Sequence, residues 1–295
     1  MMRMVRAGRD ELSALLAKGN RQRYPVLYVL DAEWNFYLVC PVVQFMEQSR
    51  QLPDFLVVGV PNVDREHDLT PTPYPNEPAS GGGPFFESFL NEELAREIDA
   101  KFRTVSYRIL VGHSAGGLTI SAVAERVPEL LLAVVYLSGF MLPSGMQVFE
   151  MLQHETMSSS LGPGLFVGNP AATGATRINV GSANDAYRSR LRATFYGDMS
   201  ESEFALATSQ LHCDEPVGAV APSGITPGRF GTVPRHYIRC TQDRAVPLAG
   251  QDHMIATVDG TIGGKTTIHS LDSSHSPFLS QPAALSKILT GIFGY

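Results

Sequence analysis

Two near-continuous apolar runs constrain the fold of this chain more than any other sequence feature. Residues 24–30 and 55–60 are rich in Val, Leu and aromatic side chains, and neither run alternates between apolar and polar positions. Strands of this composition are buried on both faces, which is typical of a parallel sheet covered by helices. We therefore predict an α/β fold whose sheet begins with residues 24–30.

Strand and helix patterns alternate along much of the remaining chain. Further strands are predicted at residues 106–111, 131–137, 235–240 and 266–271. Helices are predicted at residues 9–18, 36–51, 85–102 and 115–126. This alternation is the βαβ organisation of a parallel sheet. A single domain over residues 1–295 is the default expectation for an α/β chain of this length.

Two segments interrupt the alternation. Residues 61–84 hold six prolines and the triplet Gly81–Gly83, so we predict a long surface loop there, with neither helix nor central strand. Residues 141–232 scatter Met, Ser, Gly and Pro among helical pieces at residues 185–195 and 201–211. We interpret this second segment as a helical cap inserted over the sheet.

The composition excludes several classes of partner. The formal net charge is −6 and no basic run occurs, so neither nucleic acid nor an anionic membrane surface is expected to bind. The charged N-terminal segment and the absence of a long apolar run predict a cytoplasmic protein without a membrane span. Cys40, Cys213 and Cys240 are too widely separated to indicate a disulfide framework or a zinc site. The oligomeric state stays open, and a homodimer is one of the alternatives.

The strongest functional signal is the segment Gly112–Gly116, GHSAG, which matches G-x-S-x-G. It lies between the predicted strand at 106–111 and the predicted helix that begins near Ala115. In this setting the serine occupies a strained strand-to-helix turn that exposes its hydroxyl. Side chains at Gly112 or Gly116 are expected to collide with neighbouring backbone. We predict that Ser114 is a nucleophile.

A serine nucleophile needs a base, and the C-terminal region supplies one. His275 follows the predicted strand at 266–271, on a loop that can carry its imidazole over the sheet edge. Asp243 follows the preceding predicted strand and places a carboxylate at a strand's carboxyl end, where sites in open α/β sheets gather. Asp272 is close to His275 in sequence and reaches its far side less easily, and Asp214 lies inside the cap. We favour Asp243 as the residue that orients His275.

A tetrahedral oxyanion needs amide donors. One is expected from Ala115, at the start of the helix after the serine. The second is expected from the loop after the first strand, at Ala32 or Glu33. His113 occupies the variable position of the motif, and the remaining histidines are interpreted as surface or packing residues. No histidine is predicted to bind a metal.

These residues resemble the α/β-hydrolase superfamily over nearly the whole chain. Residues 24–126, with YPVLYVLDAEWNF and RILVGHSAGGL, look like the putative-esterase branch related to esterase D and siderophore esterases. From about residue 131 onward, VVYLSGFMLPSG, FYGDMSESEFALA and LDSSHSPFL look like the plant-type methylesterase and hydroxynitrile lyase branch. A recombined or engineered chain would explain two such halves.

The resemblance implies an α/β-hydrolase fold, with a mostly parallel sheet flanked by helices and a helical cap over the active site. It implies a triad of Ser114, Asp243 and His275 in the usual places of the family. It also implies a sheet that starts at residues 24–30 and lacks an earlier antiparallel hairpin.

The predicted activity is hydrolysis of a carboxylic ester through an acyl-enzyme, with no cofactor and no metal. Small, largely uncharged esters are expected, because Met141, Met146, Met151 and Met157 suit an apolar pocket in the cap, although core filling explains each of them as well. Two alternatives stay open, a hydroxynitrile lyase-like enzyme that cleaves a C–C bond and a non-catalytic small-molecule binder.

Hydroxynitrile lyases of this branch typically carry a lysine directly after the catalytic histidine, and here that position is Ser276. A neutral hydroxyl cannot supply the positive charge of that lysine, which favours the esterase over the lyase. The similar haloalkane dehalogenases use a carboxylate nucleophile, which Ser114 excludes.

Overall fold

The computed structural model describes most of the chain. The described residues are 4–7, 23–30, 40, 43–44, 47–48, 54, 56–61, 65–68, 81–105, 108–168, 175–209, 214–216 and 224–293. They fall into two compact units, residues 1–106 with 289–295 and residues 107–288. The predicted helix at 9–18 lies outside the described residues, and the one at 36–51 is described at a few helical positions only. The single domain over the whole chain stays a prediction.

The first unit contains a three-stranded sheet in the order β1-β3-β2. β2 (Val26–Leu30) and β3 (Leu56–Val60) are parallel, as their apolar sequences predicted. All five residues of β3 are buried, which explains why its sequence does not alternate. β1 (Met4–Ala7) pairs antiparallel with β3. The expectation that the sheet begins at residues 24–30 is therefore wrong, because an earlier strand covers the second edge of β3.

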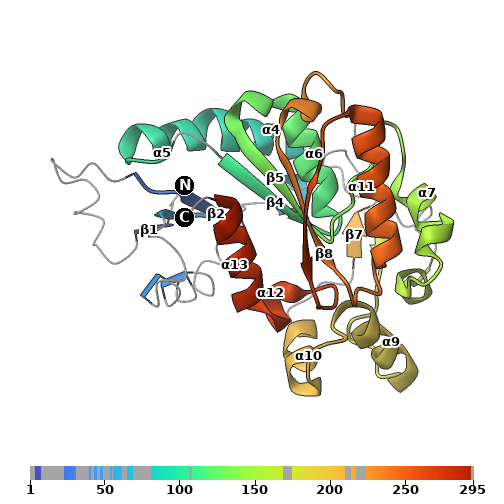
Figure 1. Cartoon of the computed structure of the whole chain (residues 1–295). Coiled ribbons are helices and arrows are strands. Elements are labelled where there is room, and N and C mark those ends of the chain that lie inside the picture. Colours follow the sequence, from blue (N-terminus) through green and yellow to red (C-terminus); the bar gives the residue numbers. More distant parts are fainter. Residues whose placement is uncertain are drawn as a thin grey trace. The chain divides into compact units, whose positions relative to one another are not determined.

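One continuous helical segment follows in the first unit (Figure 1). It consists of α4 (Gly83–Ser88), the π-helical η1 (Phe89–Leu94) and α5 (Ala95–Lys101). The predicted loop at 61–84 is only partly described, and it contains one helical turn, α3 (Arg65–Asp68). The exclusion of helix from this loop was therefore wrong. Pro84 lies in the first turn of α4, where proline is tolerated because its missing amide proton has no partner to lose.

The second unit is built on a four-stranded parallel sheet in the order β4-β5-β8-β9. Its strands are β4 (Arg108–His113), β5 (Leu131–Leu137), β8 (Arg235–Cys240) and β9 (Thr267–Leu271), close to their predicted positions. Because all four strands run in one direction, their carboxyl ends meet at one edge of the sheet. Loops that leave this edge carry Ser114, Asp243 and His275.

Helices α6 (Gly116–Arg126) and α11 (Leu248–Ile262) share one hydrophobic core with this sheet (Figure 1). At its centre the rings of Tyr136 and Tyr237 stack with their centroids 5.9 Å apart. The Tyr136 hydroxyl lies 2.7 Å from the Ser121 hydroxyl, so the buried phenol keeps a hydrogen-bond partner. The second unit also contains η2 (Pro128–Leu130) and α12 (Pro277–Ser280), and α13 (Pro282–Phe293) begins in the second unit and ends in the first.

The segment between β5 and β8 contains the region predicted as a helical cap. Its helices are α7 (Val148–Leu152), η3 (Glu155–Met157), η4 (Gly162–Leu165), α9 (Asp185–Phe195), α10 (Glu201–Thr208) and η6 (Phe230–Thr232). It also contains a small antiparallel sheet of β6 (Ala175–Arg177) and β7 (Asp214–Pro216), which the sequence did not predict. α9 and α10 enclose a small core of their own around Leu191 and Phe204.

Candidate active site

Ser114 lies in the sharp turn between β4 and α6. Its backbone φ is 52°, a left-handed conformation that costs a residue other than glycine about 1–2 kcal/mol. The carbonyl of Ser114 accepts hydrogen bonds from the amides of Gly117 and Phe140, at 3.1 and 2.9 Å, which hold the turn in place. A strained strand-to-helix turn is therefore present at the G-x-S-x-G motif.

Glycines around this turn allow three backbone segments to meet. A Cβ at Gly112 would lie 2.5 Å from the carbonyl oxygen of Gly116, so the expected collision occurs there. A Cβ at Gly116 would meet nothing within 4 Å, and the same expectation for Gly116 was wrong because its hydrogen atoms face open space. The second crowded position is instead Gly117, where a Cβ would lie 2.4 Å from the carbonyl oxygen of Phe140.

His275 and Asp243 meet at the carboxyl edge of the sheet. Nδ1 of His275 lies 2.7 Å from Oδ2 of Asp243, and the two residues are 2% and 5% exposed. The register of the strands explains the meeting, because Cys240 pairs with Leu271 and the two residues follow these strand ends by three and four positions. An aspartate at this distance holds the Nδ1 proton on the imidazole and leaves Nε2 available as a base.

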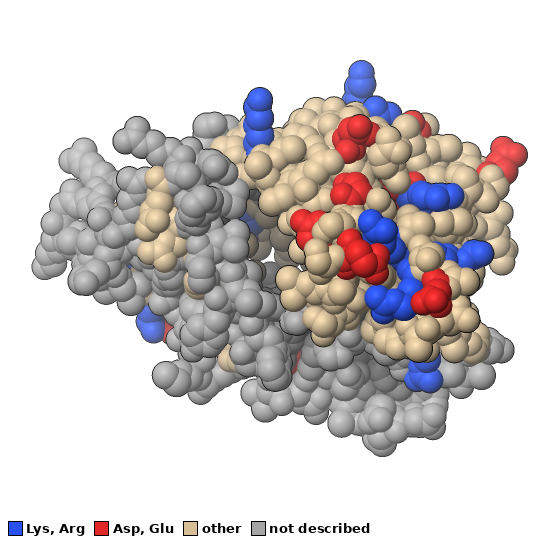
Figure 2. All heavy atoms as spheres, turned by 90° about the horizontal axis from the view of Figure 1, so that it is seen from below, with Lys and Arg blue, Asp and Glu red and all other residues tan. Residues whose placement is uncertain are grey.

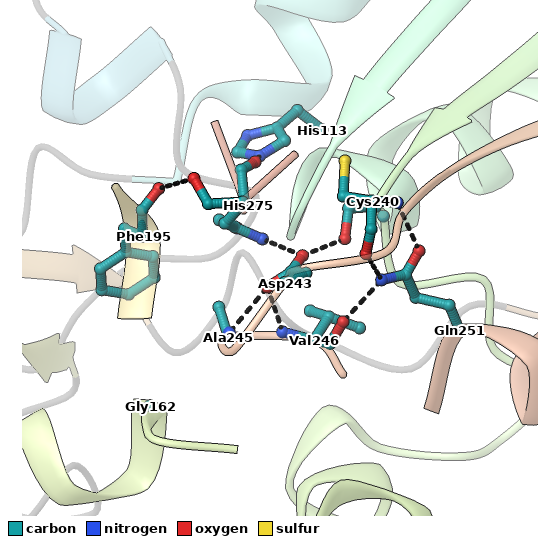
Figure 3. Close-up of polar contacts among 12 residues, drawn as sticks. His113, Gly162, Phe195, Cys240, Asp243, Ala245, Val246, Gln251 and His275 are labelled. Atoms are coloured by element: carbon teal, nitrogen blue, oxygen red, sulfur yellow. Dashed lines mark hydrogen bonds and ion pairs between the residues drawn. The ribbon is translucent and has the colours of Figure 1, made fainter. Parts of the chain in front are cut away.

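Asp243 is held by more donors than its histidine partner alone (Figure 3). Its Oδ1 accepts hydrogen bonds from the amides of Ala245 and Val246, at 2.7 and 2.9 Å. Its Oδ2 accepts a further hydrogen bond from the hydroxyl of Ser138, which directly follows β5. Within the described chain, Ser114 and Ser138 are the two residues other than glycine with positive φ. Strained residues at two neighbouring strand ends therefore border the same site.

A buried glutamine fixes the turn that carries Asp243. Nε2 of Gln251, on α11, donates to the carbonyls of Cys240 and Val246, and its Oε1 accepts from the Cys240 amide (Figure 3). The side chain is fully buried and all three hydrogen bonds lie between 2.7 and 3.1 Å. This network ties both ends of the segment around Asp243 to a helix.

His113 contributes to the site, although the sequence marked it only as the variable position of the motif. Its Nε2 lies 2.8 Å from the carbonyl oxygen of His275, so Nε2 carries a proton and donates. The two imidazole rings lie 4.4 Å apart between centroids, and Phe278 packs edge-on against His113 at 5.0 Å. Burial, and then the neighbouring His275, lower the pKa of His113 to about 3. His113 is therefore neutral at physiological pH.

The carboxylate of the competing acid Asp272 is engaged away from His275. Oδ1 of Asp272 accepts hydrogen bonds from Thr241 and Gln242, at 2.9 and 2.8 Å, which turns its carboxylate toward the loop after β8. Asp214 belongs to β7, where its backbone pairs with Arg177. Between Asp243 and Asp272, the structure brings the carboxylate of Asp243 to the imidazole.

The remaining predicted groups divide between described and undescribed residues. Ala115 immediately precedes α6, and its amide donates to no group in the described part of the chain, which leaves it available to an oxyanion. Ala32 and Glu33 lie outside the described residues. No hydrogen bond between Ser114 and His275 occurs in this described structure, although His113, next to Ser114 in sequence, contacts His275.

Three further observations concern other kinds of site. Burial raises the pKa of the Cys240 thiol to about 12, so this cysteine is a poor nucleophile despite its position beside Asp243. The described residues contain no cluster of three or more His, Cys, Asp or Glu side chains placed to hold a metal ion. None of the described helices is both long enough and apolar enough to span a membrane.

Sequence reasoning missed Ser138, His113 and Gln251. Ser138 had a usable signal, because it directly follows a predicted buried strand at the edge where the other site residues gather. His113 and Gln251 carried no comparable signal, since their partners are separated from them by long stretches of chain or are backbone atoms.

A helix-flanked parallel sheet with these loops at its carboxyl edge is an α/β-hydrolase fold. The crystal structure of a pyrethroid hydrolase from Sphingobium faniae JZ-2 matches it with a TM-score of 0.64, covering 92% of this chain and 97% of that chain at 20% identity. The fold class predicted from the sequence is confirmed.

The family follows from the sequence itself. The family described as "Putative esterase" matches residues 15–212, more than half of the chain, and the chain belongs to it. It is also similar to two proteins of Arabidopsis thaliana. Methylesterase 17 is 29% identical over 193 residues, and "Putative methylesterase 11, chloroplastic" is 27% identical over 192 residues. These alignments cover 61% and 62% of this chain, but only 64% and 45% of the two relatives.

Both branches seen in the sequence are therefore represented among the matches. The match to the esterase family continues past residue 131, where the resemblance to the methylesterase branch begins. A recombined origin of the chain stays a prediction.

Proposed function

We propose that this protein is a serine carboxylic ester hydrolase in which Ser114 is the nucleophile, His275 the base and Asp243 the residue that orients the base. The observation that carries the proposal is the buried 2.7 Å contact between His275 and Asp243, directly beside the strained turn of Ser114. Membership of the esterase family supports the reaction class. The similarity to methylesterases supports methyl esters of carboxylic acids as substrates.

In the proposed reaction, Oγ of Ser114 attacks the ester carbonyl carbon while Nε2 of His275 takes the serine proton. The tetrahedral oxyanion accepts a hydrogen bond from the amide of Ala115, with a second donor in the region of Ala32 and Glu33. The intermediate collapses when His275 returns the proton to the leaving alcohol, which leaves an acyl group on Ser114. Water, deprotonated by His275, then attacks this acyl group and releases the carboxylic acid.

Small, largely uncharged esters remain the proposed substrate class. The cap methionines do not strengthen this part of the proposal, because Met151 and Met157 are buried with Val246 and Met254 in a hydrophobic cluster. Their volume is therefore used in packing. Support for uncharged substrates comes from the methylesterase relatives, and the catalytic machinery itself favours no alcohol or acyl group.

The competing C–C lyase would use the same three residues, Ser114, Asp243 and His275. Ser276, which occupies the position of the lyase lysine, is 3% exposed and precedes the short helix α12. A buried hydroxyl there offers no positive charge to a departing cyanide. The esterase is therefore favoured over the lyase, and a non-catalytic binder would have no use for the His275–Asp243 pair.

The test is release of p-nitrophenol from acetate and butyrate esters by the purified protein, compared with Ser114→Ala and His275→Ala. We expect turnover by the wild type and a loss of at least ~10³-fold in kcat in both variants. Methanol release from small aliphatic and aromatic methyl esters then tests the substrate class. Cleavage of mandelonitrile without ester turnover would replace the esterase with the lyase, and no turnover of either would favour the binder.

A further inference from the structure

A carboxylate of the cap binds the loop that carries His275, beside a weaker hydrogen bond of 3.4 Å from the Ser274 hydroxyl to the carbonyl of Phe195. Asp198 lies between α9 and α10, and its Oδ2 accepts a hydrogen bond from the amide of Ser274 at 3.1 Å. Its Oδ1 accepts another from the Ser274 hydroxyl. The hydroxyl of Ser280, at the end of α12, donates to Oδ2 at 2.8 Å. Three donors, on both sides of His275 in sequence, therefore converge on one side chain of the cap.

The two partners of this contact differ in burial. Ser274 is 1% exposed and directly precedes the almost fully buried His275. Asp198 is exposed, at the wall of a pocket of about 740 Å³ that also contains Ser274 and Gln242, the neighbours of His275 and Asp243 in sequence. An exposed side chain contributes little to the hydrophobic core, so a substitution of Asp198 leaves the packing of the unit in place.

The charges around Asp198 are mixed. Viewed from below, on the side where α9 and α10 lie, Lys or Arg and Asp or Glu side chains stand next to one another (Figure 2). Arg188 and Arg192 of α9 lie 3.7 and 3.5 Å from Glu201 of α10, and Asp198 takes part in neither ion pair. Burial raises the pKa of Asp198, but the hydrogen bonds from Ser274 and Ser280 outweigh it and lower the pKa below its usual value. Asp198 is therefore ionised at neutral pH and is engaged with the His275 loop.

The backbone of His275 is fixed on its other side as well. His113 donates to the carbonyl oxygen of His275 at 2.8 Å, while Asp198 accepts from the amide of the preceding residue. The peptide group that follows the His275 α-carbon is thus attached to His113, and the peptide group one residue further upstream, between Ser273 and Ser274, is attached to the cap. An imidazole must be held to within about 0.5 Å to act as a base, so both attachments bear on the reaction.

We propose that Asp198 is a positioning residue that couples the cap to the base, holding Ser274 so that the His275 imidazole stays aligned with Asp243. In the described structure its carboxylate accepts hydrogen bonds from Ser274 and Ser280 and from none of the side chains of Ser114, Asp243 and His275. The inference rests on the proposed function, in which His275 is the base. It predicts that the orientation of the imidazole, and with it kcat, depends on a residue of the cap, while substrate binding does not.

The kinetic test compares Asp198→Asn with a matched control, Asp185→Asn. Asp185 lines the same pocket and carries the same charge, but it makes no hydrogen bond to the His275 loop in the described structure. We expect Asp198→Asn to lower kcat ~10–100-fold with KM changed less than twofold, because an amide cannot accept from all three donors. We expect Asp185→Asn to stay within twofold of the wild type in both constants. A kcat of Asp198→Asn within twofold of the wild type would overturn the proposal.

A double-mutant cycle tests the route through Ser274. If Asp198 acts through Ser274, adding Ser274→Ala to Asp198→Asn should change kcat less than threefold further, although Ser274→Ala alone lowers kcat. Losses that multiply in the double variant would show that the two residues act independently and would contradict the proposal. Urea unfolding of each variant serves as the control. A midpoint close to that of the wild type would show that a loss of kcat reflects a misplaced His275 imidazole and not unfolding of the protein.

A measurement made without substrate tests the positioning role of Asp198 independently of the proposed esterase activity. The proton on Nδ1 of His275, buried between the imidazole and Asp243, should exchange slowly with solvent in proton NMR of the wild type. We expect at least ~10-fold faster exchange in Asp198→Asn and no change in Asp185→Asn. Faster exchange in Asp198→Asn would support the positioning role even if no ester were hydrolysed. If the wild type hydrolyses esters but Asp198→Asn changes neither the exchange rate nor kcat, the positioning role is refuted and the proposed esterase is not.

Discussion

The Nδ1 atom of His275 lies 2.7 Å from Oδ2 of Asp243, and this contact joins the loops that follow two adjacent parallel strands, β8 and β9. The other carboxylate oxygen of Asp243 is occupied by the amides of Ala245 and Val246. Each oxygen of the carboxylate thus has a distinct set of donors. The arrangement fixes the orientation of Asp243 and, through it, the tautomer of His275.

Asp243→Asn should reverse that tautomer. Two amides donate to the Oδ1 position, so the carbonyl oxygen of an asparagine will occupy it and the NH2 group will face Nδ1 of His275. The imidazole must then accept at Nδ1 and carry its proton on Nε2, where the base needs a lone pair. We expect kcat for p-nitrophenyl butyrate to fall ~10³–10⁴-fold with little change in KM. Asp272→Asn, which removes the competing acid, should stay within fivefold of the wild type, and the opposite ranking would exclude Asp243 as the orienting residue.

Ser138→Ala should destabilise the same carboxylate, because it removes the hydroxyl that donates to Oδ2 of Asp243. The variant removes one hydrogen bond to a buried charge, which typically stabilises a protein by about 1.5–3 kcal/mol. We expect a loss of this size in urea unfolding and a drop of ~10-fold in kcat. Ser121→Ala is the matched control, because Ser121 is equally buried but bonds to Tyr136, away from Asp243. It should lose stability and keep its kcat; equal kcat losses in both variants would point to a general packing effect.

His113 should make the protein less stable in acid. Its pKa in the folded state is about 3, below the value of 6.5 of an unperturbed histidine, so the unfolded chain binds the proton first. The contribution of neutral His113 is complete above pH 6.5 and is lost as the pH falls toward 3, by up to about 1.4 kcal/mol per pH unit. His113→Gln cannot titrate, so its free energy of unfolding should converge on that of the wild type between pH 6.5 and 4. A stability difference that is constant over this range would refute the prediction.

Two adjacent glycines at the turn of Ser114, Gly116 and Gly117, should differ in how substitution by alanine changes the free energy of unfolding. At Gly117 the new methyl group would press on the carbonyl of Phe140, which is backbone and cannot turn away. We expect Gly117→Ala to lower the free energy of unfolding by about 1–3 kcal/mol or more. At Gly116, at the start of α6, the new methyl group would point into open space. Gly116→Ala should therefore be neutral or slightly stabilising, because alanine has a higher helix propensity than glycine. Thermal unfolding of the two variants side by side measures the difference, and similar losses would contradict it.

Much of the site could be predicted because its residues sit at strand ends that the sequence marks clearly. The G-x-S-x-G motif stands where a buried apolar run meets a helical pattern, and His275 and Asp243 follow two further strand patterns. Glycine sterics were less predictable. Gly112 and Gly116 are equivalent in the motif, yet a Cβ would be crowded only at Gly112, by the carbonyl of Gly116. The second crowded position is Gly117, because Phe140 approaches it from another strand end.

The sequence by itself determined the α/β class, the position of the strand-to-helix turn at Ser114 and the set of candidate acids. Strand and helix periodicity and the steric requirements of a turn are local properties. The sequence already favoured Asp243 over Asp272, but the contact between Asp243 and His275 was decided by tertiary structure, since it depends on the register that pairs Cys240 with Leu271. Tertiary structure also decided the contacts that Ser138, His113 and Asp198 make with Asp243 and with the loop of His275. Their partners lie 76 to 162 residues away along the chain, and no local pattern encodes a contact that only the packing of separate elements creates.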